Sequence, residues 1–207
     1  MAQRPPVRDR LVISAIELLR GRGADGFGMS ELLETSGVAR RSMYQHFPDG
    51  KAQLLEAAVR AAGRHIQGEL DAALEDHSPV EALAVWITGW SETLIESDFR
   101  LGCPLAAAAQ AGTDYPDAAW AAADVLQGFI LRLTDALISD GFAPDDAVRT
   151  AGLLVSGVQG AIVTSRCLRS TAPFDDLLSH ARSVWGRDRA PDTRPAHGAP
   201  RTSSPLP

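Results

Sequence analysis

Residues 36–51 of this chain read SGVARRSMYQHFPDGK, and this stretch decides the fold of the N-terminal region. Gly37 provides the permissive backbone that a corner between two helices requires. The residues after it predict a short helix whose apolar face carries Met43 and Phe47, four positions apart. Pro48 ends that helix because its ring cannot continue the hydrogen-bond ladder. The stretch therefore predicts a turn, a short helix and the start of another helix.

The outer face of the short helix is polar and can grip a phosphate or a base edge. Its candidate DNA-binding groups are Arg40, Arg41, Ser42, Tyr44, Gln45 and His46. A helix that lies in a DNA major groove needs this combination of a few buried residues and many donors or acceptors. Two plainer interpretations stay open at this point. An Arg-Arg pair is often only a solvated face, and Tyr44 could pack half-buried with its hydroxyl in water.

Two further helices complete a three-helix unit. Apolar spacing predicts one at about residues 8–20, ended by Gly21-Arg22-Gly23, and another at about residues 29–35. After Pro48-Asp49-Gly50 a fourth helix begins, with Asp49 as its expected cap and Lys51 in its first turn. The second and third helices, with their short connection, form a helix-turn-helix.

The segment from about Val7 to Ala58 resembles the DNA-binding domain of the TetR family of bacterial transcriptional regulators. The resemblance rests on the order and spacing of Gly37-Val38, of Tyr44, His46 and Phe47, and of Lys51. In addition, residues 47–51 and the downstream Gly102-Cys103-Pro104-Leu105 resemble the LmrA/YxaF-like branch, whose members respond to small aromatic or drug-like compounds.

The resemblance implies a role for each matching position of the polar helix. Ser42, Tyr44, His46 and Lys51 match positions that contact the DNA backbone, whereas Arg40, Arg41 and Gln45 match positions that reach base edges. Two positions depart from the family pattern. Ala39 stands where a capping Ser is frequent, so a cap worth ~1 kcal/mol is absent. Arg41 stands where a small residue is common, which adds charge and bulk.

Charge is distributed unevenly along the chain. The 207 residues carry a formal net charge of −6, which would ordinarily argue against a nucleic-acid partner. Residues 1–60, however, hold nine Lys or Arg and seven Asp or Glu, a net charge of +2, while the remainder holds eleven and nineteen, a net charge of −8. The basic end can therefore face DNA while the acidic remainder is repelled by it, which biases the orientation of the protein on DNA.

The rest of the chain predicts helices only, because no stretch alternates in the manner of a strand. The expected helices lie at about residues 50–76, from 79 to a loop at 98–102, after Pro104, and at about 116–139, 144–168 and 172–186. The predicted fold class is all-α, with about nine helices. We expect a helix-turn-helix domain at 1–50, a ligand-binding and dimerisation helical domain at 51–187, and a disordered tail at 188–207.

Small residues in the eighth predicted helix would let another helix approach closely. In the family this helix and the ninth pack against the same two helices of a second subunit, so the resemblance implies a homodimer. The candidate interface comprises Leu153, Leu154, Gly157, Gly160, Ala161, Leu178, Ala181 and Trp185. The alternative is that both helices are buried within their own chain.

Aromatic residues gather in the fifth to seventh predicted helices and their loops. The candidate pocket comprises Trp86, Trp90, Phe99, Tyr115, Trp120, Gln127 and Phe129. Wide, flat side chains with few charges suit a small apolar or aromatic effector, with Gln127 or Ser91 to orient it. Ordinary core packing is the competing explanation for each aromatic taken alone.

Other functions have weaker support. The five histidines are scattered without metal-ligand spacing, and His46 has no nucleophile at a recognisable spacing, so we expect no metal, cofactor or enzymatic activity. Cys103 and Cys167 are too few for a disulfide framework, which leaves structural packing or a redox switch.

With no signal peptide and no run of 18 apolar residues, we expect a cytoplasmic protein that does not enter membranes. The alternative to an effector-controlled regulator is a DNA-binding regulator without a small-molecule effector.

Overall fold

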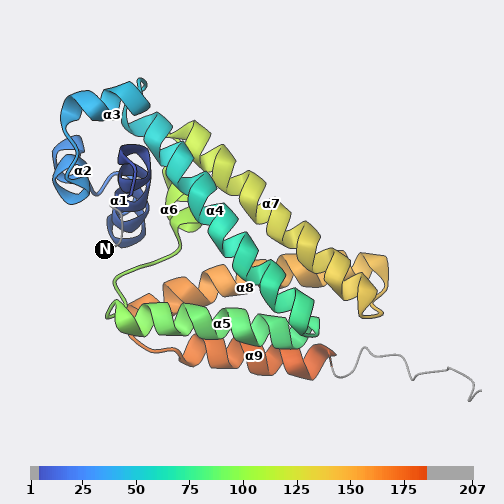
Figure 1. The fold of residues 1–207 in the computed structure, drawn as a ribbon. Helices are drawn as coiled ribbons and strands as arrows, with labels where there is room; N and C mark the ends of the chain where they lie inside the picture. The colour runs from blue at the N-terminus through green and yellow to red at the C-terminus, as the bar shows by residue number, and fades with distance from the viewer. Residues whose placement is uncertain (1–4, 186–207) are drawn as a thin grey trace, which may run out of the picture.

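The computed structural model describes residues 5–185, and Figure 1 shows this part of the chain built from helices. Their bounds are α1 Val7–Arg22, α2 Met29–Ser36, α3 Arg40–His46, α4 Lys51–Asp76, α5 Pro79–Glu96, α6 Pro104–Gln110, α7 Pro116–Ser139, α8 Pro144–Leu168 and α9 Ala172–Trp185. Residues 5–185 contain these nine helices and no strand. The predicted all-α class, with an N-terminal helix-turn-helix and a C-terminal helical domain, is confirmed.

The N-terminal unit packs α1, α2 and α3 around a small apolar core. The buried side chains that form it are Leu11, Ala15, Leu19, Phe27, Leu32, Val38, Met43 and Phe47. At the corner between α2 and α3, Gly37 adopts φ 59° and ψ 37°. Its N–H donates to Glu34 O and that of Val38 to Leu33 O, each at 3.2 Å. This left-handed backbone favours glycine, so the turn forms where the sequence predicted it.

The long helix α4 joins the N-terminal unit to the rest of the molecule and runs beside α7 (Figure 1). It buries Leu54, Leu55, Ala58, Val59, Ala62, Gly63, Ile66, Leu70 and Ala73. At Gly63 an added Cβ would lie 2.5 Å from Val125 Cγ2 of α7. A side chain at this position would therefore force the two helices apart, and glycine sets their close approach.

The remaining helices form the body of the molecule. α5 packs against α4 and α9, and α8 packs between α7 and α9, while α6 lies against α1, α4 and α7. Large side chains of the body core include Leu83, Trp86, Ile87, Leu94, Phe129, Leu133, Val158, Ile162 and Phe174. The short α6 thus contacts both the N-terminal unit and the body.

Some helix ends differ from the sequence prediction. α1 continues two residues beyond Arg20, because Gly21 and Arg22 remain helical and the chain turns only at Gly23, where φ is 76°. Asp49 does not cap α4. Gly50 occupies the N-cap position at φ 73°, without a side-chain cap.

One apolar helix and the chain ends need separate mention. Within residues 5–185, α8 is long and apolar enough to cross a membrane by length and composition, with 39% of its most apolar 18-residue window buried. Core helices of helical bundles pass the same test, so this is weak evidence for a membrane span. The predicted tail at 188–207 lies outside the described residues.

Candidate nucleic-acid interface and adjoining cavity

The polar side chains of α3 face outward. Arg40, Arg41, Tyr44, Gln45 and His46 are exposed and Ser42 is half-buried, while Met43 is fully buried and anchors the helix from below. Within residues 5–185 these six polar side chains form no hydrogen bond and no ion pair, so their donors and acceptors remain available. Such a surface can bind phosphates and base edges without first breaking internal contacts.

Tyr44 has a mixed environment that the sequence left open. Its side chain is 43% exposed, yet its ring lies against the chain turn, because a Cβ on Gly50 would be 3.6 Å from Tyr44 Cε1. One side of the ring therefore packs while the rest of the residue faces solvent. Packing and a contact through the hydroxyl are compatible for a tyrosine in this position.

Two arginines of α1, which sequence reasoning did not single out, hold the helix-turn-helix in place. Arg10 Nη1 donates to the carbonyl oxygens of Ser36 and Gly37, each at 3.2 Å, and so clasps the turn before α3. The Arg8 guanidinium lies 5.4 Å from the ring centroid of Phe47, just after α3. The sequence gave no sign of these roles, because the partners of both arginines lie more than twenty residues further along the chain.

Lys51 has partners other than the DNA backbone contact that the resemblance implied. Its ammonium donates to Ala24 O at 2.6 Å and to Phe27 O at 2.5 Å, both in the segment between α1 and α2. The same nitrogen lies 4.2 Å from the ring centroid of Phe27 and 5.3 Å from that of Tyr115. Because these contacts direct the ammonium inward, Lys51 fastens the start of α4 to the N-terminal unit.

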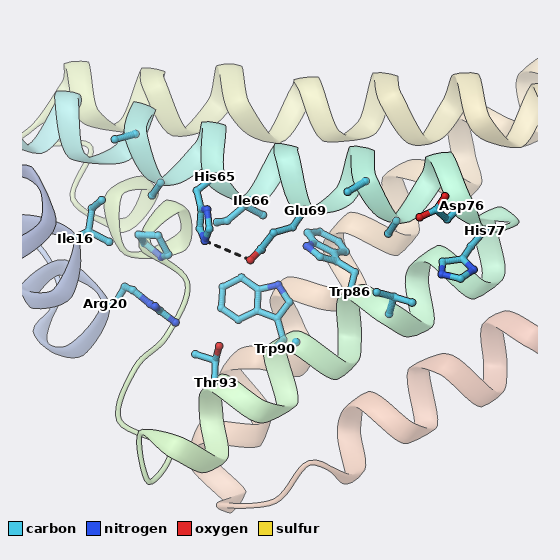
Figure 2. A pocket seen from close by; sticks show the side chains of 17 residues that line it. Ile16, Arg20, His65, Ile66, Glu69, Asp76, His77, Trp86, Trp90 and Thr93 are labelled. Atoms are coloured by element: carbon cyan, nitrogen blue, oxygen red, sulfur yellow. Dashed lines mark ion pairs between the residues drawn. The ribbon is translucent and has the colours of Figure 1, made fainter. Parts of the chain in front are cut away.

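A cavity of about 590 Å³ lies between α1, α4 and α5, next to the N-terminal unit (Figure 2). Trp86 and Trp90 of α5 form flat walls, and both are almost fully buried. Ile16 and Arg20 of α1 close the end nearest the N-terminal unit. A volume of this size is typical of sites for small organic molecules.

Polar groups that sequence reasoning missed also line this cavity. They are Arg20 on α1, His65, Glu69 and Asp76 on α4, His77 just after α4, and Thr93 on α5. His65 Nε2 and Glu69 Oε1 lie 3.3 Å apart, one turn from each other. The spacing of residues 65, 69 and 76 places them on one face of a helix, which was the available signal.

Trp86 and Trp90 line the cavity, but the α7 members of the predicted pocket do not. Phe129 is buried in the body core, its ring edge-on to Trp86 with centroids 5.9 Å apart. Trp120 is 68% exposed and Gln127 is also exposed. Trp120 and Gln127 lie two helical turns apart on the outer face of α7, whereas Phe129 lies on its inner face. The rotation of α7 about its axis, which packing sets, therefore separates the aromatic residues.

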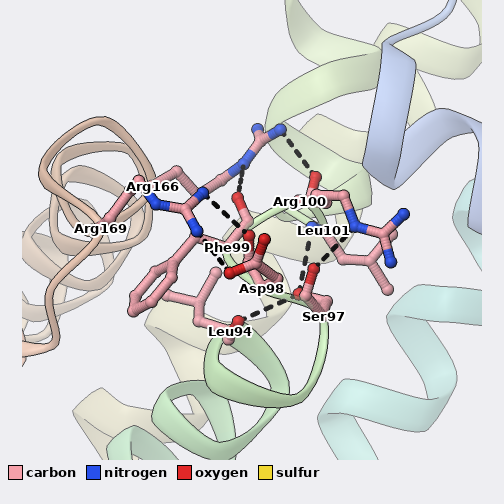
Figure 3. Close-up of polar contacts among 8 residues, drawn as sticks. All are labelled: Leu94, Ser97, Asp98, Phe99, Arg100, Leu101, Arg166 and Arg169. Carbon is pink, nitrogen blue, oxygen red and sulfur yellow. Dashed lines mark hydrogen bonds and ion pairs between the residues drawn. The ribbon is translucent and has the colours of Figure 1, made fainter.

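Phe99 and Tyr115 also lie away from the cavity. Tyr115 is beside the Lys51 ammonium, at the start of α7. Phe99 belongs to a loop in which both Asp98 and Phe99 have positive φ values, 53° and 57°. Two arginines at the end of α8 hold this loop (Figure 3): Arg166 donates to Arg100 O at 2.9 Å, and Arg169 pairs with the Asp98 carboxylate. Phe99 is therefore committed to the α5–α8 contact, with the Arg169 guanidinium 5.8 Å from its ring centroid.

Known protein families match both the N-terminal unit and the body of the molecule. Residues 11–58 match the family described as bacterial regulatory proteins, tetR family, and residues 79–180 match the transcriptional regulator LmrA/YxaF-like C-terminal domain. The uncharacterized HTH-type transcriptional regulator Rv0196 of Mycobacterium tuberculosis is 36% identical over 86% of this chain and 93% of its own length. The chain belongs to the TetR family of bacterial transcriptional regulators. It is therefore a DNA-binding regulator of the helix-turn-helix type, and its TetR-family relatives are regulators rather than enzymes.

More distant matches agree on the branch and on the fold. The uncharacterized HTH-type regulator YxaF of Bacillus subtilis is 23% identical over 84% of this TetR-family chain and 92% of its own. A TetR transcriptional regulator from Legionella pneumophila has the same fold, with a TM-score of 0.79 at 16% identity over 88% of this chain and 99% of that one. The predicted LmrA/YxaF-like membership is thus confirmed.

TetR-family regulators form dimers, and the residues predicted for that contact fall into two groups here. Leu153 is 73% exposed, Gly160 is exposed, and Gly157 and Leu178 are half-buried. Leu154, Ala161 and Ala181 are buried within the chain. Gly157 is covered by Leu177 of α9, to which an added Cβ would come within 2.9 Å. The side chain of Trp185 lies outside the described residues. Leu153 and Gly160 therefore remain the accessible members of the predicted surface.

Proposed function

We propose that this TetR-family regulator represses transcription as a homodimer on a palindromic operator, and that a small aromatic effector releases it. The observation that carries the proposal is the cavity whose wall combines α1 of the N-terminal unit with α4 and α5 of the body (Figure 2). A ligand in this cavity would touch the DNA-binding unit and the body at once. Its binding energy can therefore depend on how the two are placed.

The dimer follows from what α3 can reach. One short helix contacts only a few base pairs, whereas two copies related by a two-fold axis read two half-sites, and their free energies roughly add. Exposed apolar residues along α8, among them Leu153 at 73% and Val163 at 48% exposure, supply a surface for the second copy. In Figure 1, α9 lies at the side of the body farthest from α3 and α8 lies between α7 and α9, so a contact through these helices would leave both copies of α3 free for DNA.

Release would work through α4. Because Lys51 ties the first turn of α4 to the segment between α1 and α2, a displacement of α4 carries the N-terminal unit with it. A ligand that binds better when α4 is displaced would shift the population toward a spacing of the two α3 helices that no longer matches successive major grooves.

A binding selection on random duplexes, followed by titration of the selected DNA complex with aromatic compounds, tests this function. We expect a palindromic site bound by two copies, and at least one compound that lowers the affinity. A non-palindromic site bound by one copy would contradict the dimer. If no compound changes either operator affinity or the melting temperature, the regulator lacks a small-molecule effector, which is the alternative function.

A further inference from the structure

The geometry points to an aromatic carboxylate as the ligand of the α1–α4–α5 cavity, with its carboxylate on Arg20 and its ring between Trp90 and Trp86. This inference rests on the proposed function in one respect only, namely that the cavity is the effector site. It deepens that function by naming the chemical class of the effector and the residue that selects it.

Arg20 is the half-buried cation of the cavity wall, and most of its hydrogen-bonding capacity is unused. Its Nε donates to Gly102 O at 3.0 Å, and its guanidinium lies 5.8 Å from the ring centroid of Trp90. Within residues 5–185 its two terminal nitrogens make no hydrogen bond and no ion pair. Figure 2 shows the side chain extending toward Trp90 at the cavity end nearest α1. A guanidinium fork with free N–H groups is the preferred partner of a carboxylate.

Burial makes the charge of Arg20 costly. Desolvation by burial lowers the pKa of the Arg20 guanidinium, and the nearby Glu69 carboxylate offsets this only in part. A ligand carboxylate would add an opposite charge where water is already partly excluded, so the ion pair gains more than it would on an open surface. The cavity therefore favours an anion at this end.

The two indoles determine the rest of the ligand. Trp86 and Trp90 present wide apolar faces at the centre of the cavity, and Trp86 Nε1 is buried without a hydrogen-bond partner. A flat ring can stack against the indoles. An oxygen substituent on that ring could accept the unpaired Trp86 N–H after a small shift of the indole.

Of the two carboxylates that line the cavity, Glu69 acts on the Arg20 charge, whereas Asp76 is remote from it. Asp76 and His77 lie at the far end, beyond Trp86 (Figure 2). Glu69 is nearer, but within residues 5–185 it makes no hydrogen bond or ion pair with Arg20, and its Oε1 lies 3.3 Å from His65 Nε2 instead. These two carboxylates make an aromatic cation the competing ligand class, and the test below includes it.

Binding at Arg20 also has a direct route to DNA affinity. Arg20 and Gly102 are joined twice, because Gly102 N donates to Arg20 O at 2.9 Å while Arg20 Nε donates back to Gly102 O. This pair holds the last part of α1 to the loop before α6. A carboxylate that draws the guanidinium into the cavity would weaken one of its two hydrogen bonds and loosen the N-terminal unit.

Calorimetric titration of the full chain with three probes of one shape tests the ligand class: 2-naphthoate, 2-naphthamide and 2-naphthylmethylammonium. We expect the carboxylate to bind at least about tenfold more tightly than the amide, as a charged hydrogen-bonded pair predicts. Arg20→Gln should remove that preference while changing amide binding by less than about threefold. The matched control is Arg22→Gln, because Arg22 is an exposed α1 arginine that pairs with Glu31 outside this cavity; it should keep the preference.

Equal binding of carboxylate and amide, tighter binding of the ammonium probe, or an unchanged preference in Arg20→Gln would each overturn the inference, as would the absence of binding by all three probes. Operator affinity measured with saturating 2-naphthoate separates this inference from the proposed function. Binding that depends on Arg20 but leaves operator affinity unchanged would support the ligand class and refute effector control. A circular dichroism melt of Arg20→Gln checks that the variant is folded.

Discussion

The ammonium of Lys51 lies 2.5 Å from the carbonyl oxygen of Phe27 and 4.2 Å from the centroid of its ring. One residue at the start of α4 thus grips one residue just before α2 through both a hydrogen bond and a cation–π contact. Lys51 is the only lysine of the chain. The resemblance implied that Lys51 contacts a DNA phosphate. In this structure Lys51 joins the start of α4 to the N-terminal unit.

Replacement of Lys51 by Met should therefore act on stability first. We expect the free energy of unfolding to fall by roughly 1–3 kcal/mol, because two carbonyls lose a charged donor. Operator affinity should fall for all sequences, whereas the slope of log affinity against log salt should stay that of the parent. A slope reduced by about one unit would instead mean that Lys51 neutralises a phosphate. Urea denaturation and salt-dependent fluorescence anisotropy supply the two measurements.

The division of labour on α3 is testable at two exposed residues. Arg41→Ala and Gln45→Ala should each cost roughly 1–3 kcal/mol at the selected operator and relax the preference at one base of each half-site, because these side chains are expected to reach base edges. Arg149→Ala is the matched control, since Arg149 is exposed on α8 and pairs with Asp146. Its operator affinity should equal that of the parent. A uniform loss across all duplexes for Gln45→Ala would place that residue on the backbone instead.

Local pattern and long-range packing explain which predictions held. Helices and the Gly37 turn are specified by neighbours in sequence, such as the spacing of Met43 and Phe47, and could be predicted. The inward direction of Lys51 depends on carbonyls more than twenty residues away, and no local pattern reports them. The same limit applies to the cavity, because Trp120 and Phe129 belong to one helix, yet only packing decides which of them is buried.

The proposed dimer surface on α8 should be sensitive to charge. Leu153 is apolar, yet it is 73% exposed in the single chain. Leu153→Glu replaces it with a carboxylate. We expect this variant to be monomeric at micromolar concentration, with a loss of at least about 2 kcal/mol in dimer stability. Leu131→Glu on α7, at a site with 57% exposure, is the control and should leave the oligomeric state unchanged. Light scattering after gel filtration decides between them, and a dimeric Leu153→Glu protein would exclude this surface.

The two cysteines should differ sharply in reactivity. Cys167 is exposed, whereas Cys103 is buried, and burial raises the pKa of the Cys103 thiol. Because only the thiolate reacts, iodoacetamide at pH 8 should modify Cys167 well before Cys103 in the folded protein, and both at similar rates in urea. Mass spectrometry of timed samples gives both rates. Rapid native labelling of Cys103 would revive a redox role for it.

Close approach of α4 and α7 should make Gly63 hard to replace. An alanine Cβ there would lie 2.5 Å from Val125 Cγ2, so Gly63→Ala should destabilise the fold by about 1–3 kcal/mol despite the better helix propensity of alanine. Gly68→Ala is the matched control, because nothing lies within 4 Å of an added Cβ on that exposed glycine of the same helix. It should stabilise the protein by about 0.5–1 kcal/mol. Val125→Ala combined with Gly63→Ala should recover part of the loss, since it removes both crowded methyl groups. Equal melting temperatures for the two single variants would show that α4 and α7 can separate without cost.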